Sequence, residues 1–154
     1  MKIRNLIILI ISLLLIFGAF YINSLNKNNI NKVVHEHADF KVFINNQEID
    51  FSQEKYMLRA NDVHVENMKG NEIHKHASGI TLGYFFNTLG IEFNENCFVI
   101  EREYCNDDNN ELKLYVNNLR NYEYDSYEIS DNDKILISYG SESEEEIQGQ
   151  INSI

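Results

Sequence analysis

An apolar run from Leu6 to Ile22, close to the amino terminus, sets the strongest limit on what this chain can fold into. A helix of this length is just long enough to cross the hydrocarbon core of a bilayer. The run follows Lys2 and Arg4, and a cleavable signal peptide shares that positive start and apolar middle. Because no small-x-small cleavage site follows the run, we expect residues 1–22 to be an uncleaved N-terminal transmembrane helix.

The chain after this run divides by composition into three parts. Residues 23–32 are rich in Asn and Lys, and we expect them to form a polar linker. Residues 33–140 form the expected domain, which at about 100 residues can bury one hydrophobic core. Residues 141–154 begin with a run of acidic side chains, so we expect a disordered acidic tail.

The chain has two cysteines, Cys97 and Cys105, and the residues between them read as a strand, a turn and a returning strand. Such a pair predicts a disulfide across a hairpin, which requires an oxidising compartment. The positive-inside count leaves the orientation open, because Lys27 and Lys32 balance the basic residues before the apolar run. The cysteines therefore decide it. We expect a single-pass protein of the cell membrane with residues 23–154 outside the cytoplasm.

The part of the chain after the apolar run is strongly acidic. It contains all 24 acidic residues and 11 of the 13 lysines and arginines. Nucleic acid is an unsuitable partner, because binding phosphates needs a positive patch. The charge favours cations or a basic partner, although solubility alone also accounts for it.

Alternating apolar residues predict a sheet built from hairpins. Residues 38–44 alternate in this way and end at Asn45-Asn46, a pair that tolerates the positive φ angles of a tight turn. Segments 63–66 and 73–76 predict a second hairpin, with a loop or single helical turn before it at 52–62. Three further strands are expected, at Cys97–Arg102, Glu111–Val116 and Lys134–Tyr139. Residues 113–118 echo residues 41–46, which predicts two similar hairpins.

One amphipathic helix is expected at residues 81–89. Thr81 is a suitable N-cap, and Gly90 is a suitable stop. Strands, one helix and then more strands make an α+β fold with the helix packed across the sheet. The helix face that packs consists of Leu82, Phe85, Phe86 and Leu89.

Two segments resemble the β-grasp, or ubiquitin-like, architecture: the helical segment Ile80–Gly90 and the closing Asp-x-Asp-Lys-Ile-Leu-Ile strand from Asp131 to Ile137. The resemblance implies a β-grasp-like mixed sheet with one short packed helix. The same two segments make the chain similar to small sulfur-carrier domains, which end in an exposed Gly-Gly. Here Gly140 is followed by further residues, so carrier or conjugation chemistry is not implied.

The segments 35–46, 63–76 and 81–86 together look like an uncharacterised, histidine-rich family of membrane-anchored prokaryotic proteins, archaeal ones especially. The resemblance covers roughly residues 35–140. Some members of that family carry a protein-disulfide isomerase label, which would imply thiol–disulfide exchange. That chemistry is usually carried by Cys-x-x-Cys, and the two cysteines here are too far apart for the motif.

All five histidines fall between residues 35 and 76, as two His-x-His pairs and one single residue. Side chains two apart on a strand point to the same face. Histidine is the commonest protein ligand for zinc and copper, although imidazoles also line solvated sheet faces without binding anything. With the cysteines paired, nitrogen and carboxylate donors suit Zn(II), Cu(II) or Ni(II) better than Cu(I). The predicted ligands of a divalent transition metal, Zn(II) or Cu(II), are His35, His37, His64, His74 and His76.

Carboxylates near these histidines could complete a metal site. On an ideal strand Glu36 points away from the histidines on either side of it. Asp39 or Glu66 is therefore the better candidate for a ligand or a supporting partner. The nearby carboxylates are Glu36, Asp39, Glu66 and Glu72.

The sequence thus supports two functions of different classes. The first is a membrane-tethered extracytoplasmic domain that binds a transition metal through its histidines. The second is a non-enzymatic module whose sheet edge or acidic face docks another envelope protein, with the disulfide as a structural element. The chain has no His-Glu-x-x-His, Gly-x-Ser-x-Gly or phosphate-loop motif, which favours binding over catalysis.

Overall fold

The computed structural model describes Ser12 and residues 33–154. The expected transmembrane helix at 1–22 and linker at 23–32 lie outside the described residues, apart from that one serine. Within the described part of the chain, no helix is long and apolar enough to cross a bilayer. Residues 33–154 form one compact unit.

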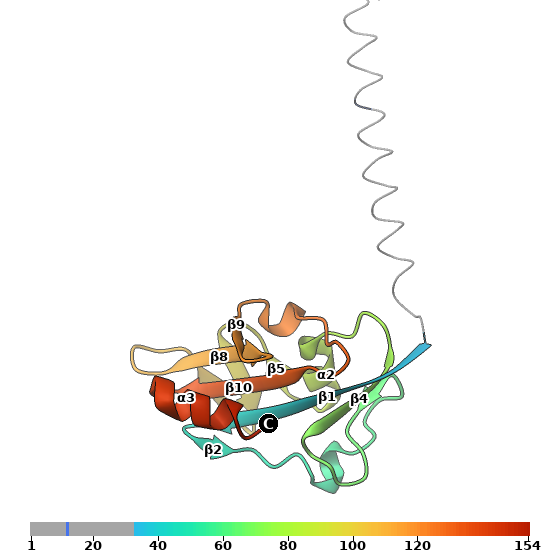
Figure 1. The fold of residues 1–154 in the computed structure, drawn as a ribbon, viewed down its shortest axis with the longest axis horizontal. Helices are drawn as coiled ribbons and strands as arrows, with labels where there is room; N and C mark the ends of the chain where they lie inside the picture. The colour runs from blue at the N-terminus through green and yellow to red at the C-terminus, as the bar shows by residue number, and fades with distance from the viewer. Residues whose placement is uncertain (1–11, 13–32) are drawn as a thin grey trace, which may run out of the picture. The chain divides into compact units, whose positions relative to one another are not determined.

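The fold is α+β, as the sequence predicts, with a mixed sheet and two helices among the described residues (Figure 1). The strands of the larger sheet are β1 (Val33–Ile44), β2 (Gln47–Glu48), β3 (Val63–His64), β4 (Glu72–Ala77), β8 (Glu111–Val116), β9 (Leu119–Asn121) and β10 (Lys134–Gly140). A smaller sheet contains β5 (Glu92–Phe93), β6 (Cys97–Ile100) and β7 (Arg102–Cys105). The helical elements are η1 (Glu54–Tyr56), α2 (Leu82–Thr88), η2 (Tyr124–Ser126) and α3 (Glu144–Ile151).

The larger sheet places the first strand of the domain beside the last. Its order is β3-β4-β1-β10-β8-β9, with β2 paired to the end of β1. Strand β1 runs parallel to β10 and antiparallel to β4, so it occupies the middle of the sheet (Figure 1). Strands β8 and β9 extend the other side of β10 in antiparallel fashion.

Two asparagine pairs make the hairpin turns that the sequence predicts. Asn45 and Asn46 both have positive φ angles and join β1 to β2. Asn117 and Asn118 do the same between β8 and β9. The expectation of two similar hairpins is therefore confirmed. Asn suits these turns because it adopts the left-handed conformation more readily than most residues.

Helix α2 begins and packs as expected. The hydroxyl of Thr81 accepts a hydrogen bond from the backbone N–H of Tyr84 and so caps the first turn. The apolar face of α2 is buried and consists of Leu82, Phe85 and Phe86.

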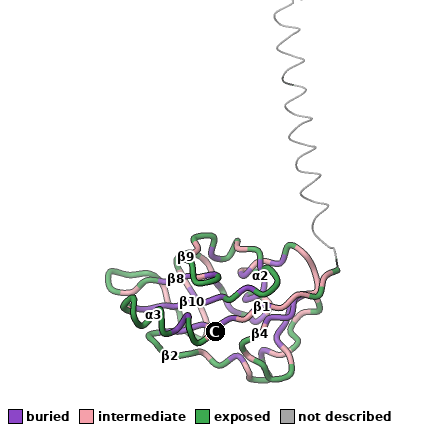
Figure 2. Tube along the Cα trace, viewed as in Figure 1, coloured by how far each residue is buried: buried purple, intermediate pink, exposed green. Residues whose placement is uncertain are grey.

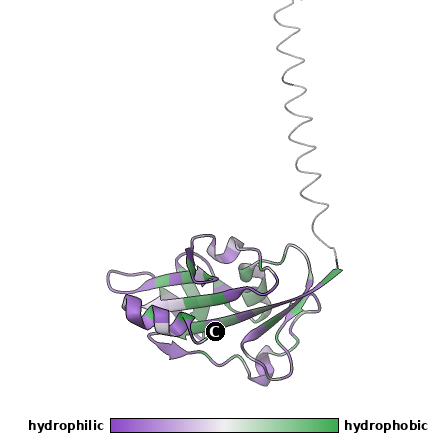
Figure 3. Ribbon diagram, viewed as in Figure 1, coloured by the Kyte–Doolittle hydropathy of each residue, from purple (hydrophilic) through white to green (hydrophobic). Residues whose placement is uncertain are grey.

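Period-two alternation separates the two faces of β1. Ala38, Phe40 and Val42 belong to the main core beneath α2, whereas Phe43 faces the opposite side. Figure 2 shows the buried residues concentrated along the central strands, and Figure 3 shows apolar residues following the same strands. The sheet is thus apolar on both faces at its centre.

The prediction of a disordered tail at residues 141–154 is wrong, and a second helix, α3, occupies this segment. The Ser143 side chain caps the Glu146 N–H, and the Glu146 carboxylate accepts from the Ser143 N–H, which together form a capping box. Ile147 and Ile151, one helical turn apart, pack against apolar side chains of the sheet. The three glutamates of its first turn, residues 144–146, therefore lie on the exposed side of an amphipathic helix. Its packing partners are Phe43 and Leu136.

Candidate metal centre

The strand register places three histidines in a row across the sheet. His37 on β1 lies opposite His74 on β4, and His74 lies opposite His64 on β3. Residues opposite each other in antiparallel strands project to the same face. The three side chains therefore share one face, and the expected second hairpin that places His64 near His74 is confirmed.

His35 and His76 form a second row next to the first. Each lies two residues along its strand from a member of the first row, and the ring centres of His35 and His76 are 5.0 Å apart. The His76 ring centre is also 5.1 Å from that of His64. All five imidazoles thus lie together, as their spacing along the chain predicts, in what we call the histidine cluster: His35, His37, His64, His74 and His76.

The histidine cluster occupies the sheet face opposite the main core. Val63 and Ile73, which alternate with the histidines on β3 and β4, are fully buried in that core. Glu36 and Lys75 also alternate with histidines and pair with each other, with 2.8 Å between the carboxylate Oε2 and the ammonium Nζ. The expectation that Glu36 points away from its neighbouring histidines is confirmed.

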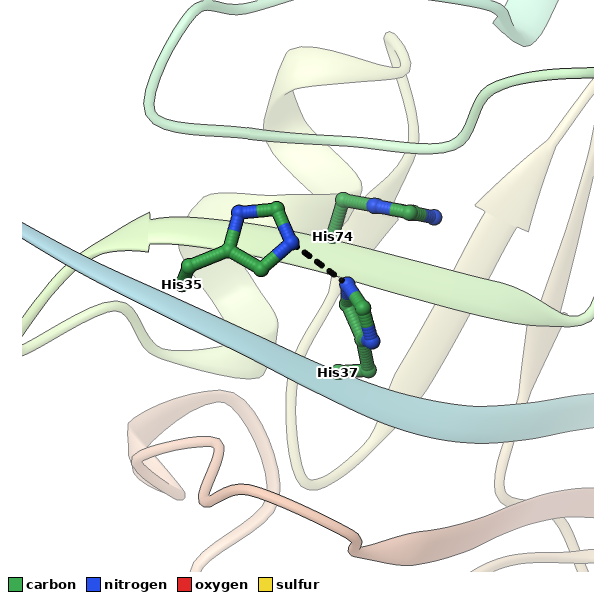
Figure 4. Close-up of side chains that lie close together, drawn as sticks. All are labelled: His35, His37 and His74. Atoms are coloured by element: carbon green, nitrogen blue, oxygen red, sulfur yellow. Dashed lines mark hydrogen bonds between the residues drawn. The ribbon is translucent and has the colours of Figure 1, made fainter.

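Three of the histidines form a compact set of donors. One nitrogen from each of His35, His37 and His74 lies within 4.8 Å of the others. The Nε2 atoms of His35 and His37 are 3.1 Å apart, and Figure 4 shows these two rings pointing toward each other with the His74 ring, from the adjacent strand, close to them. Exposure increases from buried His74 through half-buried His37 to exposed His35, so one side of the set is open to solvent.

Hydrogen bonds on the outer nitrogens fix two of the rings. The Nδ1 of His64 lies 2.9 Å from the Ala60 carbonyl oxygen, which can only accept, so Nδ1 donates, and in the neutral imidazole Nε2 carries the lone pair. The Nε2 of His74 lies 2.8 Å from Oε1 of Glu72, which leaves Nδ1 as the free nitrogen. Metal-binding histidines are oriented in the same way by carbonyl or carboxylate partners.

One carboxylate lies between these two free nitrogens. Oε2 of Glu66 is 3.6 Å from Nε2 of His64, and Oε1 of the same group is 3.6 Å from Nδ1 of His74. Glu66 is therefore placed as the sequence suggested. Asp39, the other expected carboxylate, lies in β1 opposite Glu72 in the register.

Glu72 is the supporting residue whose role the sequence did not predict. It stands two residues before His74, so the period of the strand puts both side chains on one face. The spacing of two residues could therefore have identified Glu72 as a partner of His74 from the sequence. Burial alone would raise the pKa of Glu72, but hydrogen bonds from His74 and Lys69 outweigh it and lower the pKa.

The pKa of His76 is lowered below its ordinary value. Burial is the main cause, and His64, His35 and His74 add repulsion against a second positive charge. Glu66 acts in the opposite direction. The neutral form, which can bind a metal, is therefore favoured at this position.

The predicted disulfide between Cys97 and Cys105 is present. The two residues face each other across β6 and β7 in the smaller sheet. The histidine cluster belongs to the larger sheet, so the two features are built on separate elements.

Comparison with known proteins supplies no relative for this chain. No protein-family model, curated protein or solved structure matches it. The resemblance to a membrane-anchored prokaryotic family therefore stays a prediction, and the proposals below are argued from the geometry of the domain.

Proposed function

We propose that the chain is a membrane-tethered, extracytoplasmic domain that binds a divalent transition metal, Zn(II) or Cu(II), through the histidine cluster. One observation carries this proposal: nitrogen atoms of His35, His37 and His74 approach within 4.8 Å of one another on one sheet face. Metal binding is the chemistry that this arrangement serves best, because three imidazoles on rigid strands supply most of a tetrahedral site.

The distances within the donor set suit an ion of this size. Two nitrogens each about 2.1 Å from a tetrahedral ion lie about 3.4 Å apart. The Nε2 atoms of His35 and His37 are already 3.1 Å apart. The third donor, His74, is oriented by Glu72, and its ring has to move closer to that of His35 to share the ion, because the donor nitrogens span up to 4.8 Å.

The donor types indicate which ions bind. Imidazole nitrogens select zinc and copper, whereas Mg²⁺ and Ca²⁺ prefer oxygen donors. Glu66 and Glu72 add negative charge beside the cluster, which favours a divalent cation. The exposed side of His35 gives the ion access from solvent.

The proposed location rests on two features of the chain. The apolar run from Leu6 to Ile22 has the length of an uncleaved membrane anchor. The disulfide between Cys97 and Cys105 is stable in an oxidising compartment, which favours a domain outside the cytoplasm.

The finer fold assignment that we propose is β-grasp-like. In support, β1 lies antiparallel to β4 and parallel to the last strand, β10, and helix α2 follows β4 in the chain. The β-grasp architecture shares this arrangement. It does not determine function, which has to be argued from the site.

Metal titration of the full-length chain, without a histidine tag and in detergent, tests the proposal. Calorimetry should detect tight binding of Zn(II) and Cu(II) to the wild type. Removing a residue that only orients a ligand lowers metal affinity about 10- to 100-fold. Removing two ligands in His35→Ala/His37→Ala should therefore lower the affinity for the most tightly bound ion by at least as much. Both substituted side chains are at least partly exposed, which protects the fold.

A matched control keeps the site and removes two remote charges. Asp108→Asn/Glu145→Gln changes two exposed residues outside β1, β3 and β4 and should bind metal as the wild type does. Equal, weak binding by all three proteins would reject the metal site. The interaction module, docking an envelope protein through the sheet edge or acidic face, would then be the better proposal.

A further inference from the structure

We infer that the histidine cluster holds two metal ions, bridged by the carboxylate of Glu66. The first ion binds His35, His37 and His74, as proposed above. The second binds His64 and His76. This inference rests on the proposed function and extends it from one ion to a dinuclear centre.

The first step is the number of donors. A tetrahedral ion takes four ligands, and catalytic zinc sites commonly use three protein ligands. The compact donor set of His35, His37 and His74 already meets that number, and His64 and His76 stand outside it. Two further imidazoles in the same cluster therefore exceed what one ion uses.

The second step is the position of Glu66. A nitrogen and an oxygen bound to the same tetrahedral ion at about 2.0 to 2.1 Å lie about 3.3 to 3.4 Å apart, close to the contacts that Glu66 makes. Oε1 of Glu66 lies 3.6 Å from Nδ1 of His74, and Oε2 lies 3.6 Å from Nε2 of His64. Each oxygen thus sits where it could share an ion with a different histidine, which is the geometry of a bridging carboxylate.

The third step is the orientation of the two rings beside Glu66. The Ala60 carbonyl holds Nδ1 of His64, and the Glu72 carboxylate holds Nε2 of His74. The nitrogens left free are the ones nearest to Glu66 in the measured contacts. Both rings are therefore locked with their lone-pair nitrogens toward the bridge.

The fourth step places His76 on the second ion. Imidazoles that share a tetrahedral ion have ring centres about 5 Å apart, because each centre lies about 3 Å from the ion. The His76 ring centre is 5.1 Å from that of His64 and 5.0 Å from that of His35, and only His35 belongs to the donor set of the first ion. The second ion therefore has His64, His76 and one oxygen of Glu66, which leaves a fourth position for water.

The number of bound ions tests this inference. Full-length protein in detergent is titrated with Zn(II) and examined by native mass spectrometry, with melting temperature as the check on folding. The wild type should bind two equivalents and His64→Ala/His76→Ala should bind one. The control Asp108→Asn/Glu145→Gln should bind two. The single variant His76→Asn, at a half-buried position, covers the case in which the double variant does not fold.

The outcomes separate this inference from the proposed function. One equivalent in the wild type overturns the dinuclear centre and leaves the metal site standing, whereas no bound metal overturns both. Two equivalents in the wild type and also in a folded variant at His64 and His76 would place the second ion elsewhere and reject the inference.

A separate measurement tests whether the Glu66 carboxylate bridges the two ions. Two ions in a carboxylate-bridged centre lie about 3.5 to 4 Å apart, and two Cu(II) ions at that distance give a half-field transition in the electron paramagnetic resonance spectrum. The doubly loaded wild type should show this transition and Glu66→Gln should lose it, because an amide does not bridge two cations in this way. A spectrum of isolated Cu(II) ions in the doubly loaded wild type would contradict the bridge.

Discussion

At the scale of single residues, the histidine cluster follows from the period of a β-strand. The sequence predicted which side chains share a face, because His35 and His37, like His74 and His76, are two residues apart. It could not predict which ring nitrogen is free. That choice depends on the Ala60 carbonyl, which comes from a loop whose path the local pattern does not determine.

The lowered pKa of His76 makes the stability of the metal-free domain depend on pH. The unfolded chain takes up a proton near the ordinary pKa of 6.5, and the folded domain does so only at lower pH. The free energy of unfolding should therefore fall as the pH drops below about 6.5. Denaturant unfolding in the presence of a chelator should show a smaller fall for His76→Gln, and equal pH dependence in both proteins would contradict the assignment.

Metal binding should weaken as the pH falls through about 6 to 7, because a protonated imidazole cannot coordinate. Several histidines must lose protons together. We therefore expect the affinity for Zn(II) to fall about tenfold or more for each pH unit below about 6. Titration calorimetry over this range measures the effect, and an affinity independent of pH would exclude histidine as the main ligand.

At the scale of elements, turns and caps were the most predictable features. Asn45-Asn46 and Asn117-Asn118 specify their hairpins through positive φ angles, and Thr81 specifies the start of α2. The expected strand from Cys97 to Arg102 is too long, because Glu101 has a positive φ and makes the turn between β6 and β7. Glutamate rarely adopts that conformation, so the pattern gave no sign of the break.

Phe85 tests the packing of α2 on the sheet. Its side chain is fully buried, so Phe85→Ala should lower the free energy of unfolding by about 3 to 5 kcal/mol. Asn87→Ala on the exposed side of the same helix should change it by less than about 0.5 kcal/mol. Denaturant unfolding of both variants measures the difference, and a Phe85 variant as stable as the wild type would contradict this placement.

The disulfide should stabilise the smaller sheet without contributing to metal binding. It closes a short loop, so Cys97→Ala/Cys105→Ala should cost about 2 to 3 kcal/mol of unfolding free energy. Zn(II) affinity of the folded variant should match the wild type, because the cluster lies in the other sheet. Thiol labelling of the exported, non-reduced protein is the direct check. Two reactive thiols would contradict both the bond and the proposed compartment.

At the scale of the whole molecule, the α+β class was predictable and the full extent of the domain was not. The acidic run after Gly140 masked a helix, although Ser143 and Glu146 have the spacing of a capping box. The acidic composition of residues 141–154 led to the wrong prediction of a disordered tail. The helix is stable because Ile147 and Ile151 cover apolar side chains on the sheet face away from α2, which no local pattern reveals.

Helix α3 should therefore be part of the cooperative unit. Ile147→Ala/Ile151→Ala uncovers Phe43 and Leu136 and should lower the free energy of unfolding by about 2 to 5 kcal/mol. Gln148→Ala, on the exposed side of the helix, is the matched control. Thermal unfolding compares the three proteins, and an unchanged melting temperature for the double isoleucine variant would mean that α3 does not stabilise the sheet.

The pairing of β1 with β10 also determines the order in which the molecule can assemble. A chain made from its amino terminus supplies β1, β3 and β4 early, and these strands carry every histidine of the cluster. The other side of β1 stays unpaired until residue 140 has been synthesised, and such long-range pairing is slow. A nascent chain therefore has every histidine of the proposed metal site before its sheet can close.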